Sequence, residues 1–173
     1  MSSPETDHKA LLKPFLIFKN LTSDEIDLFC QRAKRIEIPA GQQFITEGEK
    51  GDSIFLLIDG SVEIIQALTL HVNKGETDNR EKALTRLDHT MHPFMGEMSL
   101  FADDDRRTAS VKATTDCVFM KIMRDDIFDI CEHHPKTGYK VMHNLCELIT
   151  KNLIRANKNV LKLTTAFSLV LER

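Results

Sequence analysis

The chain has 173 residues, a net charge of −3 and 42% hydrophobic residues, which fits one globular domain with room for a core. This slightly acidic balance gives no reason to expect a nucleic-acid partner. No apolar run approaches the roughly 18 residues of a membrane span, and the polar first nine residues lack the apolar core of a signal peptide. Since the four cysteines form no C-x-x-C pair, we expect a cytoplasmic protein with reduced thiols and no membrane partner.

The N-terminal segment carries helical signals. Residues 1–8 are polar and predict a frayed tail, and residues 11–18 form an apolar cluster around Pro14 that predicts a short helix and a turn. Thr22 and Glu25 have the spacing of a capping box, in which a hydroxyl and a carboxylate bond the free N–H groups at a helix start. We expect this helix to end near Lys34.

From residue 35 onward the hydrophobic period becomes that of β-strands. Alternating or continuously apolar runs at residues 35–38, 43–46, 54–58 and 62–65 are separated by turns, and Asp59-Gly60 predicts a hairpin. Residues 67–80 become polar and predict a long, mobile hairpin loop. Further strands are expected at residues 82–87, 108–113 and 117–122. Short strands at regular intervals predict an antiparallel β-roll or barrel.

Residues 95–111 carry the strongest functional signal. Gly96 lets backbone N–H groups approach a ligand, and residues 97–101 predict one helical turn whose free N–H groups favour an anion. Glu97 offers a carboxylate to ribose hydroxyls, and Arg107 offers a planar fork that matches phosphate oxygens, with the hydroxyl of Thr108 beside it. These residues suit a small phosphorylated sugar.

The Gly-Glu-Met-Ser-Leu motif, the ten residues from Glu97 to Arg107 and the following Thr-Ala-Ser-Val resemble the phosphate-binding cassette of the cyclic-nucleotide-binding domain family, in particular its catabolite activator protein-like regulatory domains. Turn glycines at Gly41, Gly48 and Gly60 resemble the front half of that family's β-roll, so the resemblance covers roughly residues 13–163. It implies a mainly β fold, an antiparallel, jelly-roll-like β-roll with N-terminal helices and a long C-terminal helix. It also implies no cofactor but a cAMP or cGMP ligand, with Glu97 on the ribose 2′-OH and Arg107 on the cyclic phosphate. The implied binding residues are Gly96, Glu97, Met98, Ser99, Leu100, Arg107, Thr108, Ala109 and Asn152.

Two residues bear on the base of the nucleotide. A hydroxyl at Thr108 resembles the cGMP-preferring pattern of eukaryotic family members, but bacterial cAMP receptors also carry one. By family alignment Asn152 falls near the point where the long helix meets the base, and its amide suits either purine. We expect cAMP to be favoured over cGMP. Residues 88–95 depart from the family, because they form a longer link than the usual Gly-Asp turn before the cassette and so alter one wall of the pocket.

Two helices are expected after the β-roll, one starting at Asp125-Asp126 and a long one starting at Pro135. Apolar residues of the second recur at alternating spacings of four and three, which would extend the stripe over about 42 Å. Residues 157–159, Asn-Lys-Asn, are a weak point that would divide the helix in two. The stripe favours a homodimer seam, with packing on the chain's own roll as the alternative. Its members are Met142, Cys146, Ile149, Leu153, Ala156, Val160, Leu163, Phe167 and Val170.

Three function classes compete. The first is a regulatory module that senses a cyclic nucleotide and signals to an unknown protein effector. The second, a metal-dependent enzyme on a similar roll, requires a His-x-His with a following Glu, which the sequence lacks, and the cassette has no nucleophile beside a base. The third is a ligand-free dimeric interaction or scaffold protein that retains the β-roll and pairs Arg107 with Glu97. Residues 103–105 and the scattered histidines do not require a metal, so we expect neither catalysis nor a metal site.

These signals predict one domain in three parts. The three parts are an N-terminal tail and helices at residues 1–34, a cyclic-nucleotide-binding β-roll at residues 35–124, and C-terminal hinge and dimerisation helices at residues 125–173. Since few residues follow the long helix, we expect a module without a helix-turn-helix DNA-binding domain in the given chain, with a stand-alone receptor and a piece of a longer protein as the two alternatives.

Overall fold

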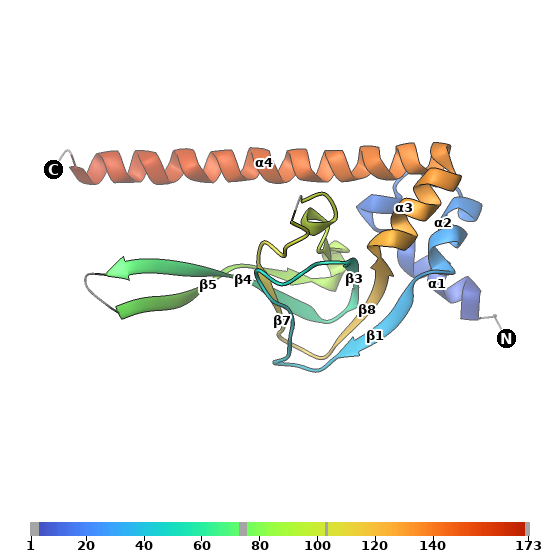
Figure 1. Ribbon diagram of the computed structural model, residues 1–173, viewed down its shortest axis with the longest axis horizontal. Coiled ribbons are helices and arrows are strands. Elements are labelled where there is room, and N and C mark those ends of the chain that lie inside the picture. The colour runs from blue at the N-terminus through green and yellow to red at the C-terminus, as the bar shows by residue number, and fades with distance from the viewer. Residues whose placement is uncertain (1–3, 73–75, 103, 172–173) are drawn as a thin grey trace.

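The computed structural model describes residues 4–72, 76–102 and 104–171, with side chains described at 8–66, 85–102 and 104–169 (Figure 1). Two four-stranded antiparallel sheets, in the strand orders β1-β8-β3-β6 and β2-β7-β4-β5, form the roll. Together with the helices around them, they confirm the predicted mainly β fold. The strands are β1 Lys34–Ile38, β2 Gln43–Ile45, β3 Ser53–Asp59, β4 Ser61–Val72, β5 Glu76–Asp88, β6 Phe94–Met95, β7 Ser110–Ala113 and β8 Cys117–Met123.

Helices α1, α2 and α3 gather at one end of the roll, and α4 runs along the whole length of the roll and beyond it (Figure 1). The 3-10 helices η2 and η3 flank β6, and η3 lies within the cassette residues 95–111. The helices are α1 Pro4–Leu12, η1 Leu16–Phe18, α2 Ser23–Cys30, η2 His89–Met91, η3 Met98–Leu100, α3 Arg124–His133 and α4 Pro135–Leu171.

The N-terminal helices correct two expectations. The capping box is present, since the Glu25 N–H donates to the Thr22 hydroxyl and the Thr22 N–H donates to the Glu25 carboxylate. However, α2 ends at Cys30 rather than near Lys34, where β1 already begins. Residues 1–3 of the expected frayed tail lie outside the described residues, and the rest is helical from Pro4 onward. Leu12 at the end of α1 is buried in the core, and Lys9 pairs with Asp27 of α2 at 2.5 Å.

The hairpin β4–β5 corrects the prediction of a loop at residues 67–80. The two strands stay paired from Ser61–Asp88 to Val72–Glu76, and the hairpin projects from the roll (Figure 1). Polar side chains do not prevent this pairing, because backbone groups alone make the hydrogen bonds of a two-stranded ladder. The predicted turn at Asp59-Gly60 is confirmed, with Gly60 at φ +95°.

Two apolar cores meet at the central strand β3. Its residues Phe55 and Leu57 point into the roll and pack with Phe119, whereas Ile54 and Leu56 belong to the core beneath the helices. This alternation follows from the opposite directions of successive side chains in a strand. The roll and the helix cluster therefore share one rigid strand, which begins beside the cassette.

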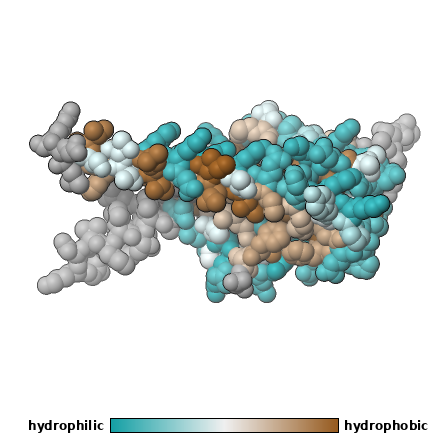
Figure 2. All heavy atoms as spheres, turned by 90° about the horizontal axis from the view of Figure 1, so that it is seen from above, coloured by the Kyte–Doolittle hydropathy of each residue, from teal (hydrophilic) through white to brown (hydrophobic). Residues whose placement is uncertain are grey.

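Helix α4 is continuous through residues 157–159, so the predicted long helix is confirmed and the weak point does not divide it. Its first part packs on the chain, with Leu145 buried and the Asn144 amide donating to the carbonyls of Ile17 and Lys19. Residues 149–169 are exposed throughout, and apolar patches lie along this half of the helix (Figure 2). The side chain of Val170, the last member of the predicted stripe, lies outside the described residues. None of the described helices, including α4, is both long enough and apolar enough to cross a membrane.

Candidate functional site

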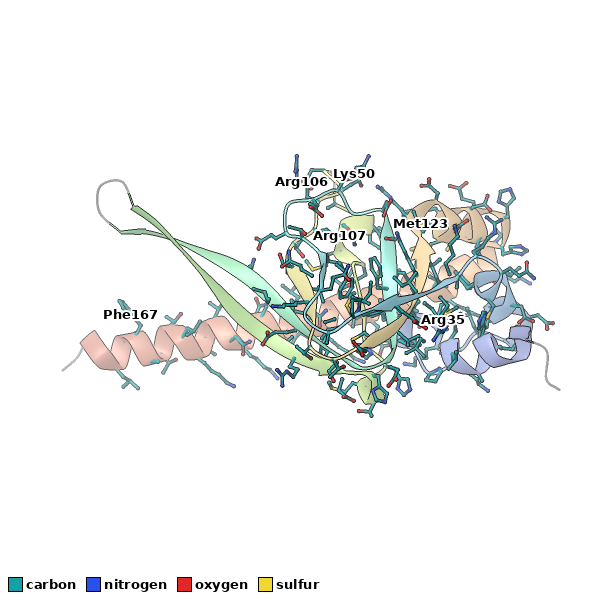
Figure 3. All side chains as sticks on the ribbon, turned by 90° about the horizontal axis from the view of Figure 1, so that it is seen from below. Arg35, Lys50, Arg106, Arg107, Met123 and Phe167 are labelled. Carbon is teal, nitrogen blue, oxygen red and sulfur yellow. The ribbon has the colours of Figure 1, made fainter. Side chains whose placement is uncertain are left out.

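Arg107 is held inside the roll by a set of protein oxygens, between the turn that precedes β3 and the start of η3 (Figure 3). Its Nη1 donates to the carbonyl of Ser53 at 2.9 Å, to the carbonyl of Gly96 at 3.2 Å and to the hydroxyl of Ser99 at 3.0 Å. Nη2 lies 3.3 Å from the Ser53 hydroxyl. Burial lowers the pKa of Arg107, while Asp52 and Glu97 oppose this shift, and the guanidinium stays charged.

Two glycines make room for this guanidinium. A Cβ on Gly96 would lie 2.3 Å from Nη1 of Arg107, and a Cβ on Gly51 would lie 2.6 Å from its Nε. Gly96 also has φ +92°, which residues with side chains rarely adopt. A glycine at position 96 therefore permits both the left-handed backbone of the turn and the close packing of Arg107.

Glu97 is a buried carboxylate without an ion pair among the described residues. It is only 8% exposed, and the hydrogen bond that favours its ionised form comes from its own backbone N–H. Burial raises the pKa of Glu97, and the positive charge of Arg107 only partly offsets this. The scaffold alternative required Arg107 to pair with Glu97, but no such ion pair forms in the described part of the chain. The carboxylate is thus set up to accept hydrogen bonds from an added hydroxyl group.

The remaining cassette residues fall into an inner and an outer group. Ser99 and Leu100 are buried, and the Ser99 hydroxyl joins Arg107 to the carbonyl of Gly96. The N–H of Leu100 donates to the carbonyl of Glu97, so it is not free for a phosphate as the predicted turn implied. Outside, Met98 is 54% exposed, with the exposed Thr108 hydroxyl 3.5 Å from its sulfur and the half-buried Ala109 next in the chain.

Asn152 is not brought to this cassette. It lies on the exposed half of α4, and its side chain makes no hydrogen bond within the described residues. Arg106 is also separate, since its guanidinium points outward and donates to the carbonyl of Gly48 at 2.5 Å (Figure 3). Successive residues of the extended chain thus send one arginine inward and one outward.

Three residues of the candidate site were missed by sequence reasoning, two in the turn before β3 and one at the first position of β3. Gly51 packs against Arg107, Asp52 supplies a nearby charge, and Ser53 provides both a carbonyl and a hydroxyl. The available signal was a Gly-Asp-Ser sequence directly before a continuous apolar strand. Its contact with the cassette, more than 40 residues later, depends on the tertiary fold.

These groups define what the site is able to bind. A buried carboxylate and the N–H groups of Met98 and Ser99 lie at the start of η3, and the fixed guanidinium of Arg107 packs against the same turn. This combination suits an anionic group joined to a hydroxyl-bearing ring. Among the described residues, no group of three or more His, Cys, Asp or Glu side chains is placed to hold a metal ion.

Comparison with known proteins agrees with this geometry. A profile of the cyclic nucleotide-binding domain matches residues 35–134. The CRP-like cAMP-activated global transcriptional regulator of Mycobacterium tuberculosis is 25% identical over 144 residues, or 83% of this chain and 58% of that protein. The cyclic AMP receptor protein of Thermus thermophilus is 27% identical over 141 residues, or 82% of this chain and 58% of that protein. The chain thus spans less than two thirds of the length of these curated relatives.

Solved structures show the same fold. The catabolite activator protein of Thermus thermophilus matches with a TM-score of 0.70 at 26% identity, over 86% of this chain and 63% of that one. A cyclic nucleotide-binding domain from Methylobacillus flagellatus matches with a TM-score of 0.74 at 23% identity, over 93% and 86%. With a profile match across more than half of its length, this chain belongs to the cyclic nucleotide-binding domain family.

Proposed function

We propose that this chain is a regulatory module that binds cAMP in preference to cGMP and signals to a protein effector as a homodimer. The observation that carries the proposal is a caged Arg107 guanidinium that contacts the short turn beginning at a buried Glu97. Glu97 has no ion pair in the described part of the chain. Binding is the implied act, because neither residue is a nucleophile with a base beside it.

The ligand lies across η3 in this proposal. The free donors of Arg107 pair with the cyclic phosphate, and the N–H groups of Met98 and Ser99 assist. Glu97 accepts a hydrogen bond from the ribose 2′-OH, which compensates the cost of burying its charge. Gly96, Leu100, Thr108 and Ala109 shape the surrounding turn and the head of β7.

The preference for cAMP has weaker support. The two curated relatives described above are named for cAMP. Asn152 meets the base from α4 only if the helix approaches the site in another arrangement or in a second copy, because it has no contact with the cassette here. Competition between cAMP and cGMP for the same site measures this preference, and tenfold tighter cGMP binding would reverse the assignment.

The switch runs from the turn to the helices. Phe101 directly follows η3, and its ring meets the Phe128 ring of α3 edge to face, with 5.8 Å between the ring centroids. Leu100 is buried in the core that contains Ile127 and Leu145. A turn drawn toward the nucleotide moves both residues, so α3 and α4 repack. The ligand drives this change only through its higher affinity for one of the two arrangements.

A second copy is the proposed occupant of the exposed α4 stripe. Leu153, Val160, Leu163 and Phe167 are each 59–71% exposed, and they follow the heptad spacing of a helix pair. Isolated exposed apolar residues are ordinary, but a stripe that lasts several turns is typical of an interface. In such a dimer each copy keeps its own cassette, because the seam involves α4 alone.

Glu97→Gln gives a pH test of the site. The substitution should weaken cAMP binding by about 1.5–3 kcal/mol, roughly 10- to 100-fold, because it removes a charge-assisted hydrogen bond. The same variant should stabilise the free protein at neutral pH, since it removes a buried charge. Burial raises the pKa of Glu97 in the folded protein above the value of 4.5 in the unfolded chain. Protonation of Glu97 therefore contributes fully to the free energy of unfolding below pH 4.5, and this contribution is lost as pH rises through the folded pKa.

Thermal unfolding of the two proteins between pH 4 and pH 8 measures this difference. The stability gap in favour of the Gln variant should widen as pH rises, and Glu132→Gln, an exposed carboxylate on α3, serves as the control with no gap. A gap that narrows with rising pH contradicts the assignment of Glu97. Retention on a cAMP resin, which the scaffold alternative forbids, tests the proposed function itself.

A further inference from the structure

Arg124, the first residue of α3, contacts both segments that hold Arg107 although it lies outside the cassette. Its backbone N–H donates to the carbonyl of Asp52 at 2.7 Å, in the turn before β3. Its guanidinium forms an ion pair with Asp105, in the cassette loop. One residue therefore fastens two distant parts of the site to the start of a single helix.

Asp105 links Arg124 to the turn that packs on Arg107. Its carbonyl accepts a hydrogen bond at 2.6 Å from the N–H of Gly51, the glycine that packs on the Arg107 side chain. Asp105 has φ +52°, a left-handed conformation that is uncommon for residues other than glycine. The loop keeps this unfavourable conformation while the carboxylate pairs with Arg124. The contact thus runs from α3 through Asp105 and Gly51 to the guanidinium that meets the phosphate.

The position of Arg124 in its helix also needs an explanation. A cation in the first turn is disfavoured, because the helix dipole is positive there. Asp105 offsets this cost, and the guanidinium also lies 5.5 Å from the centre of the Phe128 ring. Phe128 in turn contacts Phe101 at the end of η3. The two contacts, one ionic and one aromatic, join α3 to both ends of the cassette turn.

We propose that Arg124 is a positioning residue for the cyclic nucleotide. It holds the Gly51–Asp52 turn and the cassette loop in register around Arg107, and it makes nucleotide affinity depend on the position of α3. The inference rests on the proposed cyclic-nucleotide function. By linkage, the nucleotide must strengthen the Arg124–Asp105 contact by the same factor by which that contact strengthens nucleotide binding.

Two conservative variants isolate the ion pair. Arg124→Gln keeps the backbone N–H that bonds Asp52, and Asp105→Asn keeps a residue that tolerates the left-handed conformation. Each should weaken cAMP binding about 5- to 50-fold. The double variant should be no weaker than the weaker single variant, because both changes remove the same contact. Arg124→Lys should recover part of the loss, since it restores the charge without the planar fork.

Arg32→Gln is the matched control. Arg32 also pairs with α3, through Asp126 at 2.7 Å and Asp129 at 3.2 Å, but it does not reach the cassette. Its removal should leave cAMP affinity within about twofold, as expected for an exposed pair away from the site. A loss common to Arg32→Gln and Arg124→Gln would mean that loosening α3 in general weakens binding, which overturns a specific role for Arg124.

Calorimetric titration of the full chain with cAMP gives the affinities, and amide hydrogen exchange at Gly51 gives an independent readout. In the parent protein, cAMP should slow exchange at Gly51, and in Arg124→Gln saturating cAMP should slow it less. Unchanged affinity in both single variants, or additive losses in the double variant, overturns the positioning role and leaves the proposed function standing. A parent that binds neither cAMP nor cGMP overturns the proposed function, and the positioning role falls with it.

Discussion

Arg107→Ala should weaken cAMP binding by about 2–4 kcal/mol, roughly 30- to 1000-fold. Arg107 is only 8% exposed, and its guanidinium is held by Ser53, Gly96 and Ser99. A phosphate that meets it therefore forms a charge-assisted contact away from bulk water. Removing the side chain also empties the space between Gly51 and Gly96, so a lower thermal stability is expected as well.

Two neighbouring variants show whether this loss is specific. Arg107→Lys should recover only part of the affinity, because a point charge cannot bond two phosphate oxygens in the manner of a planar fork. Arg106→Ala should be nearly silent in binding, since Arg106 points outward to the carbonyl of Gly48 (Figure 3). Calorimetry on all three variants decides the assignment. Equal losses at Arg106 and Arg107, or no loss at either, would show that the phosphate does not sit on Arg107.

Replacing Leu153 and Val160 together with Glu should convert the proposed dimer into monomers. The two residues are 59% and 61% exposed and lie seven positions apart, so both face the proposed seam. Burying an unpaired carboxylate there costs about 3 kcal/mol or more at each position. Sedimentation velocity at micromolar concentration measures the change.

The matched control places the same two charges outside the stripe, as Ile154→Glu with Thr165→Glu. Both positions are exposed on α4 but do not follow the heptad spacing. This control should remain dimeric and should keep its cAMP affinity. A native chain that is already monomeric at micromolar concentration contradicts the seam, whatever the variants do.

Local patterns predicted the elements of this fold well. The capping box at Thr22 and Glu25, the hairpin glycine Gly60 and the start of α4 at Pro135 all depend on neighbouring residues, and all are present in the structure. The predictions failed where backbone pairing or distant contacts decide the outcome. Strand β4 continues to Val72 because β5 pairs with it, and α1 packs on the fold through Leu12 in the core and Lys9 beside Asp27.

The site shows the same division. The sequence motif was sufficient to predict the cassette turn and the opposite directions of Arg106 and Arg107, and the role of Glu97 as an acceptor stays a prediction. It gave no indication that Gly51 and Ser53 complete the cage, because only the pairing of distant segments brings them to the cassette. The burial of Glu97, which raises its pKa and makes an added hydroxyl favourable, is likewise a property of the folded chain.

Calorimetric titration of the full chain with cAMP and, separately, with cGMP tests the central claim most directly. We expect saturable binding of one cyclic nucleotide per chain, tighter for cAMP than for cGMP, and lost by at least about 30-fold in Arg107→Ala. The heat should vanish when the nucleotide is replaced by adenosine, which has the ribose hydroxyls but no phosphate. Absence of binding by either cyclic nucleotide, or equal binding of adenosine and cAMP, would contradict the account.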